Sequence, residues 1–228
     1  YRLFGSIATG FKAPSLYQLY DPSYGDFELQ PEKSFNAEIG AQQAHGKISN
    51  RLVAFYRTIR SGLDFSNTEF KYFNFNRQKA QGLEWETSVQ AGEKIRITGN
   101  YTLLVIKETT QSRETFNDTT YRYSLRKPRH SVNITAGYQV TKPLYVSLSG
   151  KYAGKRQDTG GYMQDDLDLP AYFILGAYAE FQASRALRFF AKAQNITNKR
   201  FFDINGYNSI PFLISGGVSW KLQGDRRD

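Results

Sequence analysis

The sequence of 228 residues contains no cysteine, one methionine and two histidines. Without thiols the chain can form no disulfide, no zinc–thiolate or iron–sulfur site and no cysteine nucleophile. Long hydrophobic runs are also missing: the longest nearly uncharged apolar stretch, Leu169 to Ala179, has about half of the ~20 residues that a membrane-spanning helix needs. Together with a mean hydropathy of -0.56, this excludes a bundle of transmembrane helices.

Positive charge is in excess but is not concentrated in one place. Thirty Lys and Arg against 21 Asp and Glu give a net charge of +9 at pH 7. The basic residues are spread along the chain and cluster only at 126–129 and 226–227, whereas a nucleic-acid-binding surface typically carries a basic stripe. We therefore expect no nucleic-acid partner. Aromatic residues, in contrast, are abundant, and 17 Phe and 16 Tyr are too many for a solvated linker.

Apolar and polar residues alternate with a period of two along most of the chain. Val146 and Leu148, for example, fall on one face of an extended strand, and Ser147 and Ser149 fall on the other. The same alternation recurs in 83–90, 95–106, 131–140 and 212–221. No segment shows a convincing period of 3.6 residues, so the pattern predicts an all-β fold.

Turn signals divide the chain into ten expected strands. These are residues 1–9, 34–43, 48–60, 77–90, 95–106, 124–140, 144–157, 169–183, 187–197 and 211–222. Short connections (44–47, 91–94, 141–143 and 184–186) take turns with long ones (10–33, 61–76, 107–123, 158–168 and 198–210). This regular change between short and long connections predicts an antiparallel, up-and-down β-barrel with two different rims.

The expected strands are long for a soluble protein. Most reach the ~9–11 residues of a tilted bilayer-spanning strand, whereas strands of globular domains usually have ~5–6. A soluble sandwich or lipocalin-like barrel also alternates, with its apolar face turned inward, and is the alternative fold. Aromatic residues near strand ends, such as Phe4, Phe35, Tyr172 and Trp220, favour the membrane, because aromatic girdles mark both interfaces. The expected fold class is an all-β, antiparallel, up-and-down transmembrane β-barrel.

Several motifs carry a family resemblance. Residues 10–16 read Gly-Phe-Lys-Ala-Pro-Ser-Leu, and residues 28–34 read Glu-Leu-Gln-Pro-Glu-Lys-Ser. Further matches are 80–84 (Ala-Gln-Gly-Leu-Glu), 126–130 (Arg-Lys-Pro-Arg-His) and 195–199 (Asn-Ile-Thr-Asn-Lys). With these motifs the sequence resembles the barrel of TonB-dependent outer-membrane receptors over almost its whole length. One departure is Asp-Phe-Glu at 26–28, where the family has Asn-Pro-Asn.

The resemblance implies a 22-stranded barrel that encloses an N-terminal plug. Residues 1–222 would be the C-terminal part of this barrel, roughly its last ten strands, and residues 223–228 a polar C-terminal tail. The plug, its TonB box and the first strands would precede Tyr1. The implied function is import of a scarce, bulky nutrient across the bacterial outer membrane with energy from TonB, without enzymatic activity. Outer-membrane lipid, lipopolysaccharide and the rest of the barrel would be further partners.

Within this family, the spacing of the two motifs in 10–33 is most similar to cobalamin transporters, and siderophore receptors share much of it. Haem receptors typically carry a His in this connection, and 10–33 contains none. His45 and His130 are expected to be polar rim residues, because two isolated histidines make no metal set. We therefore expect cobalamin or a ferric siderophore as the nutrient, with no cofactor and no bound metal.

Aromatic residues of the long connections are the candidate ligand-binding residues, because rigid amphipathic rings suit a large, partly apolar ligand. They are Tyr17, Tyr20, Tyr24, Phe27, Tyr72, Phe73, Tyr121, Tyr123, Tyr162 and Tyr207. Packing between loops or anchoring at the membrane interface is the alternative role of each. Four basic residues are candidates to meet lipopolysaccharide phosphates or an anionic siderophore, namely Arg122, Arg126, Lys127 and Arg129.

Other functions stay open on the sequence. A small complete barrel would act as a passive pore or as a protease, and a soluble β-domain is the third possibility. A protease would need a water-activating base and a paired carboxylate, for which His130 with Asp118, and Asp165 with Asp166, are the available residues. Asp165, Asp166 and Asp168 also suggest a calcium site, although a solvated loop has the same composition. No Gly-x-Ser-x-Gly elbow or phosphate-binding loop is present in the sequence.

Overall fold

The computed structural model describes residues 1–66, 69–112, 115, 117–161 and 164–221. Its elements are β1 (Arg2–Lys12), α1 (Leu16–Tyr20), β2 (Glu32–His45), β3 (Ile48–Ser66), β4 (Lys71–Ala91), β5 (Ile95–Gln111), β6 (Asp118–Tyr121), β7 (His130–Thr141), β8 (Leu144–Ala153), β9 (Arg156–Asp158), β10 (Leu167–Leu169), β11 (Tyr172–Gln182), β12 (Leu187–Gln194) and β13 (Leu213–Trp220). Within these described ranges, no helix has the length and apolar character needed to cross a membrane.

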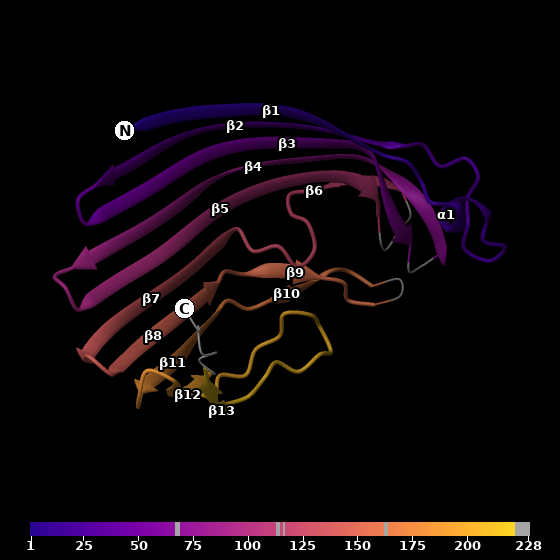
Figure 1. Ribbon diagram of the computed structural model, residues 1–228. Coiled ribbons are helices and arrows are strands. Elements are labelled where there is room, and N and C mark those ends of the chain that lie inside the picture. The colour runs from indigo at the N-terminus through magenta and orange to yellow at the C-terminus, as the bar shows by residue number, and fades with distance from the viewer. Residues whose placement is uncertain (67–68, 113–114, 116, 162–163, 222–228) are drawn as a thin grey trace, which may run out of the picture.

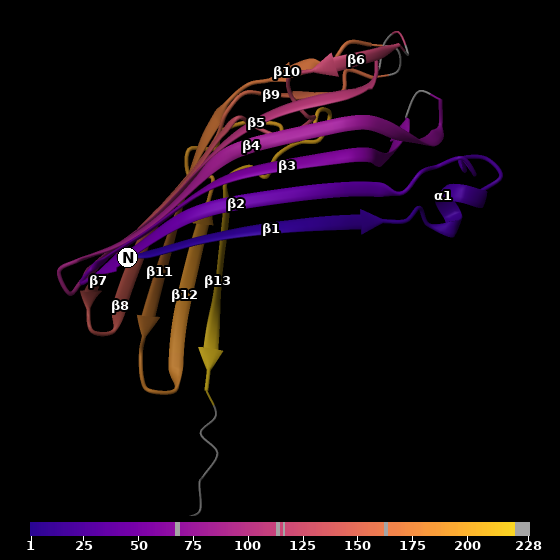
Figure 2. The same ribbon diagram turned by 90° about the horizontal axis from the view of Figure 1, so that it is seen from above.

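Ten long strands form one antiparallel sheet, in which each long strand pairs with the next one along the chain. Their order is β1-β2-β3-β4-β5-β7-β8-β11-β12-β13; the short β6 pairs with β5, and β9 and β10 form a separate hairpin (Figure 1). This order confirms the predicted antiparallel, up-and-down arrangement. The two edge strands, β1 and β13, run in different directions in Figure 2, because neighbouring strands of a sheet are twisted relative to one another.

The two ends of the sheet differ. At one end, here called the turn end, only residues 46–47, 92–94, 142–143 and 183–186 separate neighbouring strands. The opposite end, here called the loop end, carries the long connections with α1, β6, β9 and β10 (Figure 1). The predicted alternation of short and long connections is therefore confirmed.

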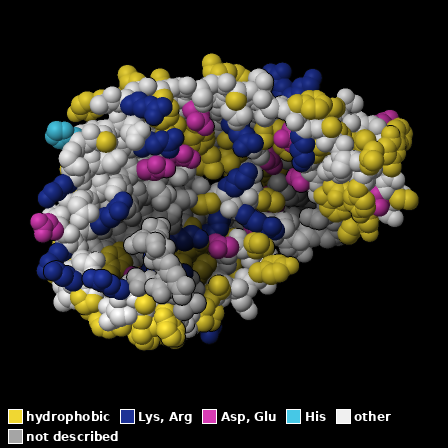
Figure 3. Space-filling view, viewed as in Figure 1, with side chains coloured by type: hydrophobic (Ala, Val, Ile, Leu, Met, Phe, Trp, Pro, Cys, Tyr) yellow, Lys and Arg dark blue, Asp and Glu magenta, His cyan; other side chains and the backbone are white. Residues whose placement is uncertain are grey.

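The register gives the sheet one apolar and one polar face. An apolar row runs across eight strands through Leu3, Ala41, Leu52, Trp85, Tyr101, Val132, Tyr152 and Phe173. The adjacent row, one residue along each strand, faces the other way and contains Arg2, Gln42, Arg51, Glu86, Asn100, Asn133 and Lys151. Figure 3 shows the hollowed side of the sheet, on which many Lys, Arg, Asp and Glu side chains lie.

The apolar face is not folded into a compact interior. Ile7 and Ile39 are 77% and 69% exposed, and Leu148 and Ile214 are 62% and 66% exposed. In a soluble β-domain these side chains would be packed against a second layer, and an exposed apolar surface of this extent marks a membrane or protein contact. The structure therefore contradicts the soluble alternative and agrees with a face turned to lipid.

Two predicted long connections are largely strand, which corrects the sequence analysis. β3 and β4 continue as a hairpin through the expected loop 61–76, and β5 continues to Gln111 and pairs with β6 inside the expected loop 107–123. β3 and β4 have 19 and 21 residues, about twice the length that a bilayer requires. The aromatic and Thr residues of these segments favour strand, so the hairpins extend beyond the apolar face.

Two other boundaries also differ from the prediction. Residues 124–129, expected to begin a strand, form a turn, because Pro128 lacks the N–H that a strand ladder needs and Arg126 has a φ of 64°. The first long connection contains α1, which the period-two pattern did not reveal. Ser15 and Gln18 form its capping box: the Gln18 N–H donates to Ser15 Oγ over 3.2 Å, and the Ser15 N–H donates to Gln18 Oε1 over 2.9 Å.

Candidate functional site

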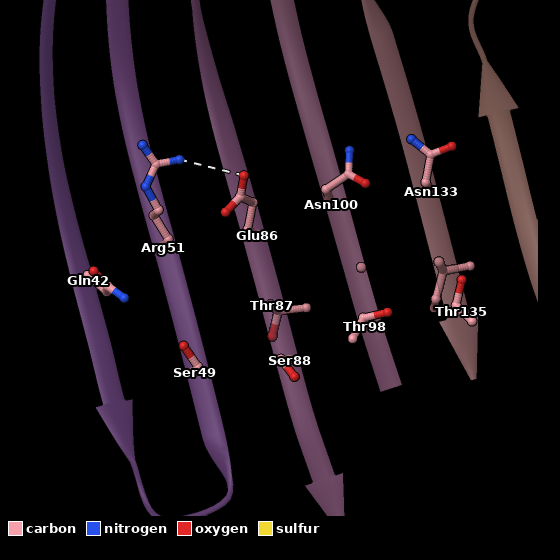
Figure 4. A pocket seen from close by; sticks show the side chains of 12 residues that line it. Gln42, Ser49, Arg51, Glu86, Thr87, Ser88, Thr98, Asn100, Asn133 and Thr135 are labelled. Carbon is pink, nitrogen blue, oxygen red and sulfur yellow. Dashed lines mark ion pairs between the residues drawn. The ribbon is translucent and has the colours of Figure 1, made fainter. Parts of the chain in front are cut away.

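The polar face provides a hydrogen-bonding surface nearer the turn end. A shallow hollow of about 420 Å³ lies between β2 and β7 and is lined mainly by hydroxyl, amide and charged side chains. Gln42, Arg51, Glu86, Asn100 and Asn133 come from five successive strands and lie in one row (Figure 4). The Nη1 atom of Arg51 lies 3.5 Å from Oε1 of Glu86, and both side chains remain partly exposed. Such a row suits contact with water or with another polar surface.

Aromatic side chains gather at the loop end of β3 and β4. The rings of Tyr17 and Tyr72 meet edge to face with centroids 6.1 Å apart. Phe65 contacts Tyr72 at 5.0 Å and Tyr24 at 6.0 Å, also edge to face. Tyr17, Tyr24, Phe65 and Tyr72 are here called the aromatic cluster; Figure 3 shows hydrophobic side chains gathered over this end of the molecule.

The sequence analysis named three members of the aromatic cluster but missed Phe65. The missed signal was the alternation Leu63-Asp64-Phe65, which continues the β3 pattern beyond the assumed end of the strand. Around Tyr17, burial and the nearby carboxylate of Asp21 raise the pKa of the phenol, so Tyr17 remains a neutral hydrogen-bonding group at physiological pH. The cluster therefore presents rings with polar hydroxyl groups rather than charges.

Hydrogen bonds of the Asn74 side chain, and one between backbone groups, hold the 13–31 connection against the β3–β4 hairpin. The Gln30 N–H donates to Asn74 Oδ1 over 2.7 Å, and Asn74 Nδ2 donates to the carbonyls of Gln30 and Ser61 over 2.9 and 2.8 Å. The Tyr72 N–H donates to the carbonyl of Tyr24 over 3.0 Å. The motif at 28–34 is thus fixed to β4 through Gln30, and this attachment positions the aromatic cluster.

The other candidate residues do not all join the aromatic cluster. Tyr20, Phe27 and Tyr207 are 69%, 77% and 72% exposed, and Phe73 is half-buried. Tyr121 and Tyr123 form their own pair with centroids 5.2 Å apart. The Tyr123 hydroxyl donates to Asp166 Oδ2 over 2.8 Å. Tyr162 lies outside the described residues.

A buried carboxylate joins three connections at the loop end. The side chain of Asp158 is fully buried and accepts hydrogen bonds from Arg126 Nε over 2.7 Å, the Asn205 N–H over 2.6 Å and the Thr159 N–H over 2.8 Å. Burial alone would raise the pKa of Asp158, but these hydrogen bonds outweigh it and lower the pKa. Asp158 is therefore a permanently charged acceptor at neutral pH.

A second buried group reinforces this link. The guanidinium of Arg156 is almost completely buried; it donates to the carbonyl of Phe202 and lies 3.2 Å from Asp203 Oδ1. It also stacks over the ring of Tyr172 at 5.0 Å, and the Tyr172 hydroxyl donates to Asp203 over 2.7 Å. Arg156 and Asp158 thus connect 154–171 to 195–212 at two points. Neither residue was predicted from the sequence, because the partners Arg126, Phe202 and Asn205 that define these links are 32 to 47 positions away.

The structure gives no support to the proposed protease pairs. His130 Nδ1 and the Tyr101 hydroxyl are joined by a hydrogen bond of 2.9 Å, and Asp118 accepts from Asn76 over 2.9 Å. Asp166 is bonded to Tyr123 rather than paired with Asp165. Over the described part of the chain, no three His, Asp or Glu side chains converge as a metal-binding group would require, which also removes support for the suggested calcium site.

Comparison with known proteins gives sequence relatives among transporters. The vitamin B12 transporter BtuB of Vibrio cholerae is 25% identical over 209 residues, which cover 89% of this chain and 32% of the relative. BtuB of Vibrio vulnificus is 26% identical over 219 residues, covering 94% of this chain and 33% of the relative. The chain spans about a third of the length of these curated relatives.

Solved structures show the same fold. The copper transporter OprC matches with a TM-score of 0.76 at 11% identity, over 96% of this chain and 37% of that chain. The ferric enterobactin receptor PfeA of Pseudomonas aeruginosa matches with a TM-score of 0.73 at 20% identity, over 96% of this chain and 38% of that chain. At these identities the likeness establishes the fold alone.

A family model agrees with the sequence relatives and with the fold. The model described as TonB dependent receptor-like, beta-barrel matches residues 1–196, which is most of the chain. Proteins of this family are receptors and transporters of the Gram-negative outer membrane, not enzymes, and the sheet described above is part of such a barrel. The chain belongs to the TonB-dependent receptor β-barrel family.

Proposed function

We propose that this chain supplies part of the barrel wall, and the connections at its loop end, of a receptor that imports cobalamin or a ferric siderophore. The observation that carries this proposal is the aromatic cluster at the loop end, combined with the polar face along the same sheet. Aromatic rings with hydroxyl groups suit a large nutrient that has both apolar and polar surface. A polar inner face keeps the path beneath them hydrated.

The relatives favour cobalamin as the first candidate nutrient. The sequence matches at 25% and 26% identity are named vitamin B12 transporters. A ferric siderophore is the second candidate, since PfeA is named a ferric enterobactin receptor and shares the fold. Copper, named for OprC, is less well supported, because no His, Asp or Glu group in the described residues forms a metal-binding cluster.

Ligand contact is assigned first to Tyr17 and Tyr72, whose rings meet in the aromatic cluster. The strongly exposed Tyr20 and Phe27 would extend this surface outward, whereas Tyr207 would contribute from the β12–β13 connection. The remaining candidates would contribute from the neighbouring connections; they are Tyr24, Phe73, Tyr121, Tyr123 and Tyr162. In this arrangement the cluster supplies a preorganised centre, because ring packing has already restricted its side chains.

The proposed receptor needs more than this sheet. The edge strands β1 and β13 carry ladder groups that cannot face lipid unpaired, so residues 1–222 would be continued by further strands of a 22-stranded barrel. Residues 223–228 would be a polar tail. Energy would come from TonB through a plug inside the barrel, while outer-membrane lipid and lipopolysaccharide surround the apolar face.

The test uses the complete receptor that contains this chain and measures binding of cyanocobalamin and of ferric enterobactin by calorimetry. Tyr72→Ala removes two edge-to-face contacts, each worth about 0.5–1.5 kcal/mol, and should weaken binding of the true nutrient about tenfold. Tyr72→Phe keeps the ring and should stay within about threefold, since a net hydrogen bond contributes only ~0.5–1.5 kcal/mol.

A matched control is Phe189→Ala, which removes a ring from the apolar face near the turn end. It should leave nutrient binding unchanged. Unchanged binding by a correctly folded Tyr72→Ala receptor would refute the assignment to the aromatic cluster. A receptor that binds neither nutrient but conducts ions freely in planar bilayers would instead be a passive pore.

A further inference from the structure

The wall of the sheet opens at the loop end between β5 and β8. β7 separates these strands only as far as the pairs Leu103–His130 and Ser131–Ala153, and beyond them β5 continues without it. The turn at 122–129 crosses this opening, held by hydrogen bonds from the Leu104 N–H to the Arg129 carbonyl and from the Gly154 N–H to the His130 carbonyl. A hollow of about 520 Å³ remains between β5, the turn and β9.

Basic side chains line this hollow, here called the rim hollow. Arg122, Lys127, Arg129 and Lys155 are all exposed and all contribute to its lining, and no Asp or Glu is among the described lining residues. Four cations within one hollow repel each other unless an anion lies between them. Their arrangement around a common space therefore points to an anionic occupant.

Three carboxylates of this region, Asp158, Asp166 and Asp203, are bonded to groups other than the cations of the rim hollow. Of the basic residues in this region, Arg126 is paired with Asp158 and Arg156 with Asp203. Asp166 is bound by Tyr123. Within the described ranges, none of the four cations of the rim hollow forms an ion pair with a carboxylate of the chain. Arg126 and Arg156 thus have carboxylate partners, whereas among the described residues the four cations that line the hollow have none.

The rim hollow begins where the apolar face ends. Tyr101 and His130 are stacked with centroids 6.1 Å apart, and Tyr152 lies beside Val132 in the apolar row. Aromatic residues of this kind mark the membrane–water interface of transmembrane barrels. His130 and Tyr152 also line the hollow, so the hollow is at the level of lipid headgroups.

We propose that the rim hollow is a phosphate-binding site. Arginine and lysine together form charge-assisted hydrogen bonds with phosphate oxygens, and Arg can do so with two parallel bonds. The turn that carries Lys127 and Arg129 is fixed in advance, since the Arg126 N–H donates to the Gln157 carbonyl over 2.7 Å and the Arg126 side chain is bound to Asp158. Because the site lies beside the aromatic residues of the membrane interface, its position favours a phosphorylated lipid headgroup. A soluble phosphate compound would offer the same phosphate oxygens.

The experiment uses the complete receptor in dodecyl maltoside micelles, which contain no phosphate. Native mass spectrometry measures retention of bisphosphorylated lipid A, of the same lipid without phosphates, and of inorganic pyrophosphate. The test variant combines Lys127→Gln, Arg129→Gln and Lys155→Gln. The control variant removes the same charge at the turn end with Lys47→Gln, Lys94→Gln and Lys142→Gln, which are also exposed.

The wild type and the control variant should retain bisphosphorylated lipid A about tenfold more than the phosphate-free lipid, and the test variant should lose this preference. If pyrophosphate fails to compete with the lipid, the phosphate that the site binds belongs to a lipid. If pyrophosphate binds alone and displaces the lipid, the site binds a soluble phosphate compound. Both outcomes support a phosphate site. The proposed phosphate site would be overturned if the test variant and the wild type retained bisphosphorylated lipid A and pyrophosphate equally well. Cyanocobalamin binding, measured on the same proteins, is expected to be unchanged, so this result is independent of the proposed nutrient.

Discussion

The carboxylate of Asp158 is fully buried, yet it lies 2.7 Å from the Nε atom of Arg126, whose side chain is still 45% exposed. The same carboxylate accepts the backbone N–H of Asn205 from a connection 47 positions away. Asp158 therefore joins its own connection to the turn at 122–129 and to the 195–212 connection. This turn carries three of the four cations of the rim hollow, so this buried group also supports the proposed phosphate site.

Asp158→Ala is expected to release the 195–212 connection. The substitution removes the charged acceptor of the Asn205 N–H, and a hydrogen bond to a charged group contributes about 1.5–3 kcal/mol. Hydrogen exchange of the complete receptor should show about tenfold or greater loss of protection in 195–212, with the strands unchanged. As a control, Asp165→Ala removes an exposed carboxylate from the 154–171 connection, which also contains Asp158. Unchanged protection in Asp158→Ala would show that Arg156 alone holds the connection.

The attachment of the 195–212 connection to Asp158 should also be lost in acid. The pKa of Asp158 is lowered in the folded protein, so its charge stabilises the fold fully above the unfolded pKa of about 3.9, and this contribution is lost as the pH falls through the folded value. The rate of limited proteolysis within 195–212 should therefore be constant around neutral pH and should rise only below about pH 4. Asp158→Asn should remove this acid step. A step near neutral pH would assign the opening to another group.

A cross-strand contact on the polar face gives a third prediction. Phe4 and Gly40 are register partners, and the Phe4 ring lies so close over Gly40 that a Cβ there would meet the ring. Gly40→Ala should displace the ring and cost about 1–3 kcal/mol, seen as a lower temperature for loss of the folded, heat-modifiable form in electrophoresis. In a Phe4→Ala background the same Gly40→Ala change should cost less than about 0.5 kcal/mol. Equal costs in both backgrounds would contradict a direct contact.

Sequence alone predicted the strands and their faces because lipid and water impose different side chains on alternate residues. Val146 and Leu148 face one way and Ser147 and Ser149 the other, as expected, and their partners in β7 and β11 continue the same faces. Strand ends were less predictable, because above the membrane both faces meet water and the alternation no longer marks the limit. The β3–β4 hairpin therefore extends to Ser66 and Lys71, beyond the predicted ends.

The candidate site depended on contacts that no local pattern encodes. Tyr17 and Tyr72 were recognised as aromatic loop residues, but their meeting requires the 13–31 connection to fold onto β4. The Asn74–Gln30 hydrogen bonds that hold it join residues 44 positions apart. Likewise Arg156 and Asp158 resemble ordinary charged loop residues until their buried partners are known.

Asn74 gives the last prediction, because its side-chain amide holds the 13–31 connection. Asn74→Ala removes three hydrogen bonds and leaves the Gln30 N–H and the carbonyls of Gln30 and Ser61 to be met by water. These groups are only partly buried, so a loss of about 1–2 kcal/mol is expected rather than the full cost of buried groups. Nutrient affinity, measured by calorimetry, should fall about tenfold through misplacement of Tyr17 and Tyr24, while Tyr72 stays on β4. Asn76→Ala, two positions along the same strand, removes one exposed hydrogen bond to Asp118 and should leave affinity unchanged. If both variants bind alike, the attachment of 13–31 does not position the site.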